Sequence, residues 1–176
     1  MSVRPIHLLG SGALRDRATE VESAGDGVRQ LVEDLFDTMR ADKGIGLAAN
    51  QLGELRRVAV VETEEQSFVL INPVIIEREG STAAEEGCLS IPDIYGDVKR
   101  AARVVVDTQT LDGTIHRIEA TELVARAIQH EIDHLDGILF IDRLSPLKRR
   151  LLLRKWERLR KGKTGYLKEV AAASEA

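Results

Sequence analysis

The segment from Gln129 to Gly137 holds the side chains that are best suited to metal chemistry. His130 and His134 lie four residues apart, and Glu131 directly follows the first histidine. On a helix this spacing places both imidazoles on one face, where they can bind a single divalent ion. A carboxylate beside the ion can accept a proton from water as that water attacks a carbonyl. The segment predicts a hydrolytic metal site, although a pattern this short also arises by chance in ordinary helices.

A metal site needs a third ligand, and few side chains can supply it. One protease family extends the pattern as H-E-x-x-H-x-x-G-x-x-H, but here the final position is Phe140, which cannot bind a metal. His7 and His116 lie in no recognisable ligand context, and a downstream glutamate would have to be Glu157, within a basic stretch. Cys88 is the single cysteine of the chain and is therefore the leading candidate.

Length and composition indicate a globular protein of one domain. The chain has 176 residues, of which 43% are hydrophobic and 3% aromatic, so Val, Ile, Leu and Ala build most of the core. The net charge is −4, no apolar run is long enough to cross a membrane, and the first residues lack a secretory segment. We expect a cytoplasmic catalytic domain over residues 1–170, a disordered tail over 171–176, and no contact with DNA or a membrane.

Hydrophobic spacing predicts the elements that must position these residues. Apolar residues recur every three or four positions in three segments, which indicates amphipathic helices, and Val- and Ile-rich segments bounded by turn residues indicate antiparallel strands. The expected helices cover residues 28–40, 121–137 and 146–161, and the expected strands cover 57–62, 67–77, 103–110 and 114–119. Thr121 can cap the second helix, and Gly137 should end it. The residues after Pro92 should form a loop as far as Arg100. Because proline cannot donate to a strand ladder, the strand should end at Pro92 or lie at a sheet edge there.

Two further segments have both a structural and a functional interpretation. The segment from Gly44 to Gly53 is either a tight turn with small packing residues or a loop whose backbone approaches a ligand. Leu123 and Ala127 share the helix face of the histidines, so they either pack in the core or border a pocket beside the metal.

The charge of the chain is unevenly placed. Between positions 148 and 168 lie ten of the 25 basic residues and one acidic residue, Glu157. The helix expected at 146–161 also carries a stripe of apolar side chains that should pack on the body of the protein. Its cationic face is either a solvated surface or a docking site for the phosphates of RNA.

Three motifs together resemble those of peptide deformylases of the bacterial type. Residues 44–51 are similar to that family's G-x-G-L-A-A-x-Q motif, residues 86–90 to E-G-C-L-S, and residues 129–137 to Q-H-E-x-D-H-L-x-G. The motifs occur in the family's order, and the similarity runs from about Val3 to Arg150. The resemblance implies an α+β fold in which antiparallel sheets surround a central metal-binding helix, with an N-terminal and a C-terminal helix. It also implies removal of the formyl group from the N-terminal methionine of newly synthesised polypeptides.

The resemblance assigns roles to individual residues. It implies Cys88, His130 and His134 as metal ligands, with ferrous iron in the cell, although a thiolate and two imidazoles also suit zinc, nickel or cobalt. Glu131 would be the general acid and base, and Gln51 and the backbone N–H of Leu89 would face the oxygen of the formyl group. On the substrate side, Gly46 would lie against the peptide backbone, and Ile45 would face Leu123 and Ala127 across the methionine side chain.

Two other functions fit parts of the same pattern. The first is a zincin-like metallopeptidase acting on internal peptide bonds, which the missing third histidine disfavours. The second is a binding module that a metal merely stabilises. Such a module would not need Glu131 or Gln51, so the presence of both favours an enzyme.

Overall fold

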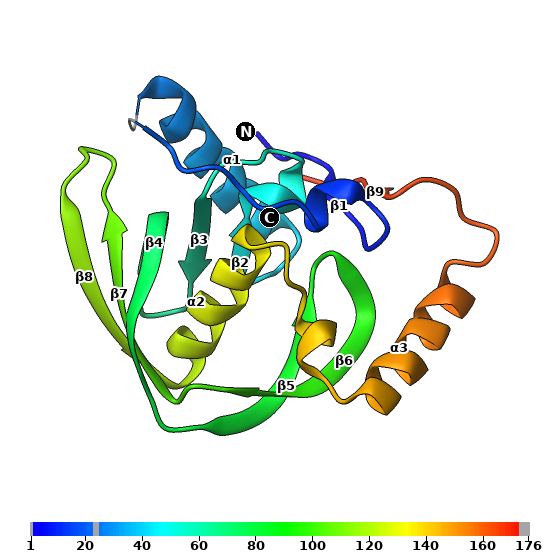
Figure 1. Ribbon diagram of the computed structural model, residues 1–176. Helices are drawn as coiled ribbons and strands as arrows, with labels where there is room; N and C mark the ends of the chain where they lie inside the picture. The colour runs from blue at the N-terminus through cyan, green and yellow to red at the C-terminus, as the bar shows by residue number, and fades with distance from the viewer. Residues whose placement is uncertain (1, 23–24, 173–176) are drawn as a thin grey trace.

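The computed structural model describes residues 2–22 and 25–172 (Figure 1). Its α-helices are α1 (Asp26–Ala41), α2 (Glu122–Leu135) and α3 (Pro146–Leu159). Its strands are β1 (Ile6–His7), β2 (Gly46–Ala48), β3 (Val58–Glu62), β4 (Ser67–Glu79), β5 (Thr82–Cys88), β6 (Ile91–Arg100), β7 (Arg103–Gln109), β8 (Ile115–Thr121) and β9 (Leu167–Lys168). Short 3-10 helices cover Gly12–Leu14, Ala49–Leu52 and Phe140–Arg143. The disorder expected at 171–176 falls mostly on residues 173–176, which lie outside the described part of the chain.

A five-stranded antiparallel sheet in the order β2-β3-β4-β7-β8 separates two hydrophobic layers. Successive side chains of a strand point to opposite faces, and in β3 both faces are buried. Val58 and Val60 join the core that includes α1, whereas Ala59 and Val61 join the core that includes α2. Helix α2 therefore lies against one face of this sheet, with the β5–β6 hairpin beyond it (Figure 1). The expected α+β class with antiparallel sheets around the histidine helix is confirmed.

The loop expected after Pro92 is wrong, because residues 91–100 form strand β6 and pair with β5. Buried and exposed side chains alternate along β6, as in a strand with one face on a core. Pro92 is tolerated because this sheet has two strands, so each strand is an edge. The hairpin turn between Cys88 and Ile91 carries Leu89 and Ser90 toward α2.

Helix α2 ends where the sequence indicated. Gly137 has a φ of +75°, and a Cβ there would lie 2.5 Å from the carbonyl oxygen of Arg15, so both conformation and space require glycine. The expected cap at the other end is wrong in detail. Thr121 occupies the N-cap position, but its side chain makes no capping hydrogen bond.

Helix α3 packs less than its apolar stripe suggested. Trp156 is buried in the core formed with β6, but Leu147 and Leu151 are 64% and 54% exposed. Leu152 packs against the same core, and Leu159 is 38% exposed. The expectation that the whole stripe packs on the body is therefore wrong for Leu147, Leu151 and Leu159. Ser145 caps α3 by accepting a hydrogen bond from the backbone N–H of Lys148. None of the helices in the described residues is long and apolar enough to cross a membrane.

Candidate metal centre

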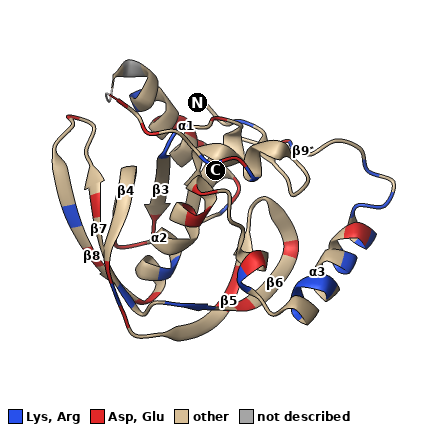
Figure 2. Ribbon diagram, viewed as in Figure 1, with Lys and Arg blue, Asp and Glu red and all other residues tan. Residues whose placement is uncertain are grey.

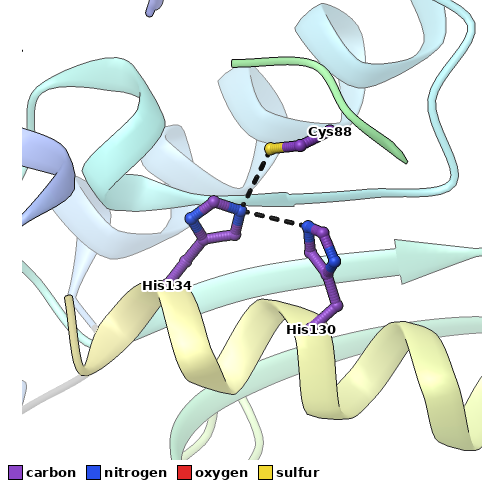
Figure 3. A group of neighbouring side chains, drawn as sticks. All are labelled: Cys88, His130 and His134. Atoms are coloured by element: carbon purple, nitrogen blue, oxygen red, sulfur yellow. Dashed lines mark hydrogen bonds between the residues drawn. The ribbon is translucent and has the colours of Figure 1, made fainter. Parts of the chain in front are cut away.

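Helix α2 and the end of β5 bring three potential metal ligands together (Figure 3). His134 Nε2 lies 3.2 Å from His130 Nε2 and 3.4 Å from Cys88 Sγ. Ideal tetrahedral coordination with ordinary Zn–N and Zn–S bond lengths would separate such atoms by about 3.4 and 3.6 Å. These two separations are close to those values, and all three donor atoms lie within 4.8 Å of one another, near enough to share one ion.

A buried carboxylate orients the first histidine. His130 Nδ1 lies 2.9 Å from Glu86 Oε1, and donation of its N–H to this oxygen leaves Nε2 free to bind an ion. Glu86 also accepts hydrogen bonds from Arg100 at 2.8 and 2.9 Å and from Arg126 at 2.7 Å. Burial alone would raise the pKa of Glu86, but its hydrogen bonds from Arg100 and His130 outweigh it and lower the pKa to about 2. Glu86 is therefore an anion at neutral pH.

The same network extends along α2 to Asp133, which follows His130 by three residues and lies on the same side of the helix. Arg100 Nη1 donates to Asp133 at 2.6 Å, and Arg143 donates to both oxygens of Asp133 at 2.7 Å. Arg100, Arg126 and Arg143 each form an ion pair with Glu86, with Asp133 or with both. The network fixes α2 against the β5–β6 hairpin, and so it fixes the histidines relative to Cys88.

The sequence interpretation missed this network, although it contained a signal. Arg126 precedes His130 by one helical turn, and Glu86 precedes Cys88 by two residues, so a charge of each sign lies next to a ligand. Arg100 gave no signal, since it lay at the end of the expected loop.

Glu131 lies beside the ligands in an environment that disfavours its charge. Glu131 is 4% exposed, and its Oε1 atom is buried without a hydrogen-bond partner in the described part of the chain. Burial raises the pKa of Glu131 to about 7. A carboxyl with a pKa near neutrality can both accept and return a proton. A bound ion would add a positive charge nearby and favour the ionised form.

The glycine motif lies directly against this carboxylate. A Cβ on Gly46 would overlap the Glu131 side chain, at 2.8 Å from its Cδ. A Cβ on Gly44 would lie 2.6 Å from Cδ1 of Leu89. Both glycines are thus required by close approach to site residues, which favours the functional interpretation of this segment over a simple tight turn.

Gln51 joins the glycine motif to the cysteine motif. Its Oε1 accepts a hydrogen bond from the backbone N–H of Ala48, and its Nε2 donates to Ser90 Oγ, both at 3.0 Å. The same Nε2 lies 3.6 Å from Cys88 Sγ. The amide is therefore held in one orientation, with its N–H groups beside the ligand sulfur.

A cavity of about 450 Å³ opens over these residues. All the site residues predicted from the sequence line it except His134, which is buried beneath: Ile45, Gly46, Gln51, Cys88, Leu89, Leu123, Ala127, His130 and Glu131. Leu123 is 54% exposed, so it belongs to the wall of the cavity and not to the core. Ala127 is buried at 5% exposure and also packs in the core.

The ligand set required by a zincin-like protease is not assembled. Glu157 is exposed on α3, and Phe140 is buried with its ring 6.3 Å from that of His130. Among the described residues, the group that could hold a metal ion consists of Cys88, His130 and His134.

Comparison with known proteins agrees with this geometry. The sequence pattern of the polypeptide deformylase family matches residues 3–150. A peptide deformylase from Acidobacterium capsulatum is 46% identical over 166 residues, which cover 92% of this chain and 98% of that protein. The crystal structure of a peptide deformylase from Thermus thermophilus superposes with a TM-score of 0.84 at 43% identity, over 90% of this chain and 98% of that one. That of a peptide deformylase from Synechococcus elongatus in complex with actinonin has a TM-score of 0.84 at 40% identity, over 89% and 87%.

The cluster of Cys88, His130 and His134 agrees with the match over most of the chain. The chain belongs to the polypeptide deformylase family, metal-dependent hydrolases that remove the formyl group from the N-terminal methionine of new polypeptides.

Proposed function

We propose that Cys88, His130 and His134 hold the catalytic metal ion and that Glu131 is the general acid and base. The observation that carries this proposal is the approach of the three donor atoms to within 4.8 Å of one another beneath one cavity, next to a buried carboxylate. A bound ion would act as a Lewis acid and would lower the pKa of a water molecule toward neutrality. Ferrous iron is the expected ion in the cell, and zinc, nickel or cobalt should also bind.

The protein groups around the ion would transfer the proton and stabilise the developing negative charge. The Glu131 carboxylate accepts a proton from the attacking water and delivers it to the departing amine nitrogen. Negative charge that develops on the formyl oxygen is stabilised by an N–H of Gln51 and by the backbone N–H of Leu89. Removal of one such donor typically costs about 3 kcal/mol of transition-state stabilisation.

The edge of the central sheet positions the peptide. Within the described part of the chain, strand β2 pairs with β3 alone, so an extended substrate could pair with its other edge. Gly46 lies in this strand, so the substrate backbone would pass directly over Glu131. The methionine side chain would then enter the apolar wall formed by Ile45, Leu123 and Ala127.

The decisive experiment compares blocked peptides under anaerobic conditions. Protein loaded with ferrous iron should release formate from formyl-Met-Ala-Ser, should leave acetyl-Met-Ala-Ser intact, and should not cleave longer peptides internally. About one equivalent of metal should be present in the active protein, and actinonin should inhibit it. Cleavage of an internal peptide bond would indicate a protease instead.

We further propose that this cytoplasmic enzyme, with residues 1–170 as its catalytic unit, docks on ribosomal RNA through α3. Exposed basic residues lie along the helix, and Figure 2 shows their blue segments on α3, which lies apart from the five-stranded sheet. About six phosphate contacts would make ribosome affinity fall on the order of a thousandfold between about 50 and 200 mM salt. The proposal predicts that replacing Arg150, Arg154 and Arg158 with Gln weakens co-sedimentation with ribosomes at low salt.

A matched control keeps this test specific. Gln at the exposed positions Arg17, Arg29 and Arg78 removes the same charge from other surfaces. Arg149 is left unchanged because it forms an ion pair with Asp142 at 3.2 Å. Equal loss of co-sedimentation in both triple variants would show that net charge matters and that α3 is no docking element.

A further inference from the structure

The chain beyond α3 folds back and forms part of the wall of the active-site cavity. It crosses from the end of α3 to strand β9, which pairs with β1 near the start of the chain (Figure 1). Lys168 in β9 lines the active-site cavity, and its Nζ donates to Asp42 at 2.8 and 3.0 Å. We call residues 160–168 the return segment. It lies beyond residue 150, where the match to the family pattern ends.

The return segment is held in place by several contacts of different kinds. The backbone N–H of Leu8 donates to the carbonyl of Tyr166 at 2.8 Å. The Tyr166 ring packs against Gly10, where a Cβ would lie 2.6 Å from the ring Cζ. The Arg160 guanidinium lies over the rings of Trp156 and Tyr166, at 5.6 and 5.1 Å from their centroids. The segment is therefore a fixed wall, able to shape a binding site.

This wall encloses a second hollow next to the first. The hollow has a volume of about 320 Å³ and shares Pro92, Asp93 and Lys168 with the active-site cavity. Its remaining lining is apolar and cationic: Leu8, Trp156, Leu159, Arg160, Lys163 and Leu167. We call this hollow the outer groove. It borders the catalytic cavity along these three shared residues, and its lining includes none of the metal ligands.

The lining of the outer groove indicates what it can bind. Lys168 is paired with Asp42, and the Arg160 guanidinium lies over two rings and donates to the carbonyl of Gly165. The Lys163 ammonium, together with the positive charge of Arg160, therefore faces the single carboxylate of Asp93. Leu159 and Leu167 are 38% and 57% exposed, so they offer apolar surface beside these charges. An extended peptide with alternating acidic and apolar side chains would match both features, because its alternate side chains face opposite sides.

We propose that the outer groove binds the substrate chain a few residues downstream of the formylmethionine and favours acidic residues there. This proposal rests on the proposed function, since it requires a formylated peptide in the neighbouring cavity. Because the two hollows share Pro92, Asp93 and Lys168, the nearest occupant is the downstream part of the same peptide. The enzyme would then discriminate among nascent chains by residues that never reach the metal.

The test uses three formylated peptides with the iron-loaded, full-length protein. They are formyl-Met-Ala-Ser alone, the same peptide followed by Glu-Leu-Glu-Leu, and the same peptide followed by Lys-Leu-Lys-Leu. At low salt, kcat/KM should be about fivefold higher for the Glu-tailed than for the Lys-tailed peptide, and the ratio should approach one in about 0.5 M salt. The substitution Lys163→Glu should bring the low-salt ratio to one or below.

A neighbouring lysine provides the control. Lys161 is exposed and lies two residues away, but it lines neither hollow, so Lys161→Glu should leave most of the preference intact. Lys163→Gln, with half the charge change, should give an intermediate ratio. Equal effects of the substitutions at 161 and 163, or a wild-type ratio near one at low salt, would overturn the proposal. Failure to deformylate formyl-Met-Ala-Ser would instead overturn the proposed function, so the two failures are distinguishable.

Discussion

Replacing Glu86 with Gln tests whether the metal centre depends on the charge network behind it. Gln has the shape of a protonated glutamic acid and cannot carry the negative charge that Arg100, Arg126 and His130 share. A carboxyl whose pKa falls from 4.5 to about 2 on folding contributes about 3 kcal/mol to the free energy of unfolding at neutral pH. This value agrees with the cost of about 3 to 5 kcal/mol for breaking a buried ion pair.

The pH dependence of this loss follows from the direction of the pKa shift. Because folding lowers the pKa of Glu86, its contribution is complete above about pH 4.5 and is lost as the pH falls toward 2. Wild type and Glu86→Gln should therefore differ by about 3 kcal/mol at pH 7 and by less than about 1 kcal/mol at pH 2.5. With an m-value of about 2 kcal/mol/M, the urea midpoint at pH 7 should fall by about 1.5 M.

The assay is urea unfolding of the metal-free protein, followed by circular dichroism at the two pH values. Glu85→Gln is the control, because Glu85 is the exposed neighbour in β5 and its loss should cost less than about 0.5 kcal/mol. Metal affinity of Glu86→Gln should also fall about 10- to 100-fold, since His130 loses its orienting partner. A variant as stable as the Glu85 control at pH 7, with unchanged metal affinity, would refute this account of the network.

Four further substitutions test the residues of the cavity. Glu131→Gln should retain the metal but lose nearly all turnover, because Gln cannot accept a proton; activity within tenfold of wild type would exclude the assigned role. Cys88→Ser should lower the metal content measured after dialysis, and unchanged content would argue against thiolate ligation. Gly46→Ala should place a methyl group against Glu131 and reduce kcat at least about tenfold with metal content preserved, so unimpaired kcat would show that the carboxylate can move aside. Ala127→Phe should raise KM for formyl-Met peptides more than for formyl-Ala peptides, and an equal effect on both would make this residue a packing residue alone.

The sequence predicted the metal helix because its information is local. The spacing of His130 and His134, the apolar Leu123 and Ala127 on the same helix face, and the glycine at the end of the helix are all found within a few turns. The pairing of Cys88 with that helix is not local, and spacing alone left it as one candidate. Its position became visible only in the fold, where the β5–β6 hairpin carries the thiol to the histidines.

Strand β6 shows why a charged strand is difficult to read. Its outward positions carry Asp93, Tyr95, Asp97 and Lys99, and its inward positions carry Ile94, Gly96 and Val98, so the alternation was present. Only one face of this hairpin meets a core, so its other face carries charged residues. These charges, together with Pro92, suggested a loop. Packing of the inward side chains against η3 (Phe140–Arg143) and α3 decides the structure, and that packing joins segments far apart in the sequence.

The error at β6 also concealed the residues that support the active site. Arg100, the last residue of β6, is held between Glu86 and Asp133, and these two carboxylates come from β5 and α2. A cation at this point neutralises two anions that would otherwise repel each other in a buried place. Arg100 also ties the hairpin, and therefore Cys88, to the helix that carries the histidines. The ligand geometry thus depends on a residue that approaches no ligand directly, and such a residue becomes recognisable only once β6 is paired with β5.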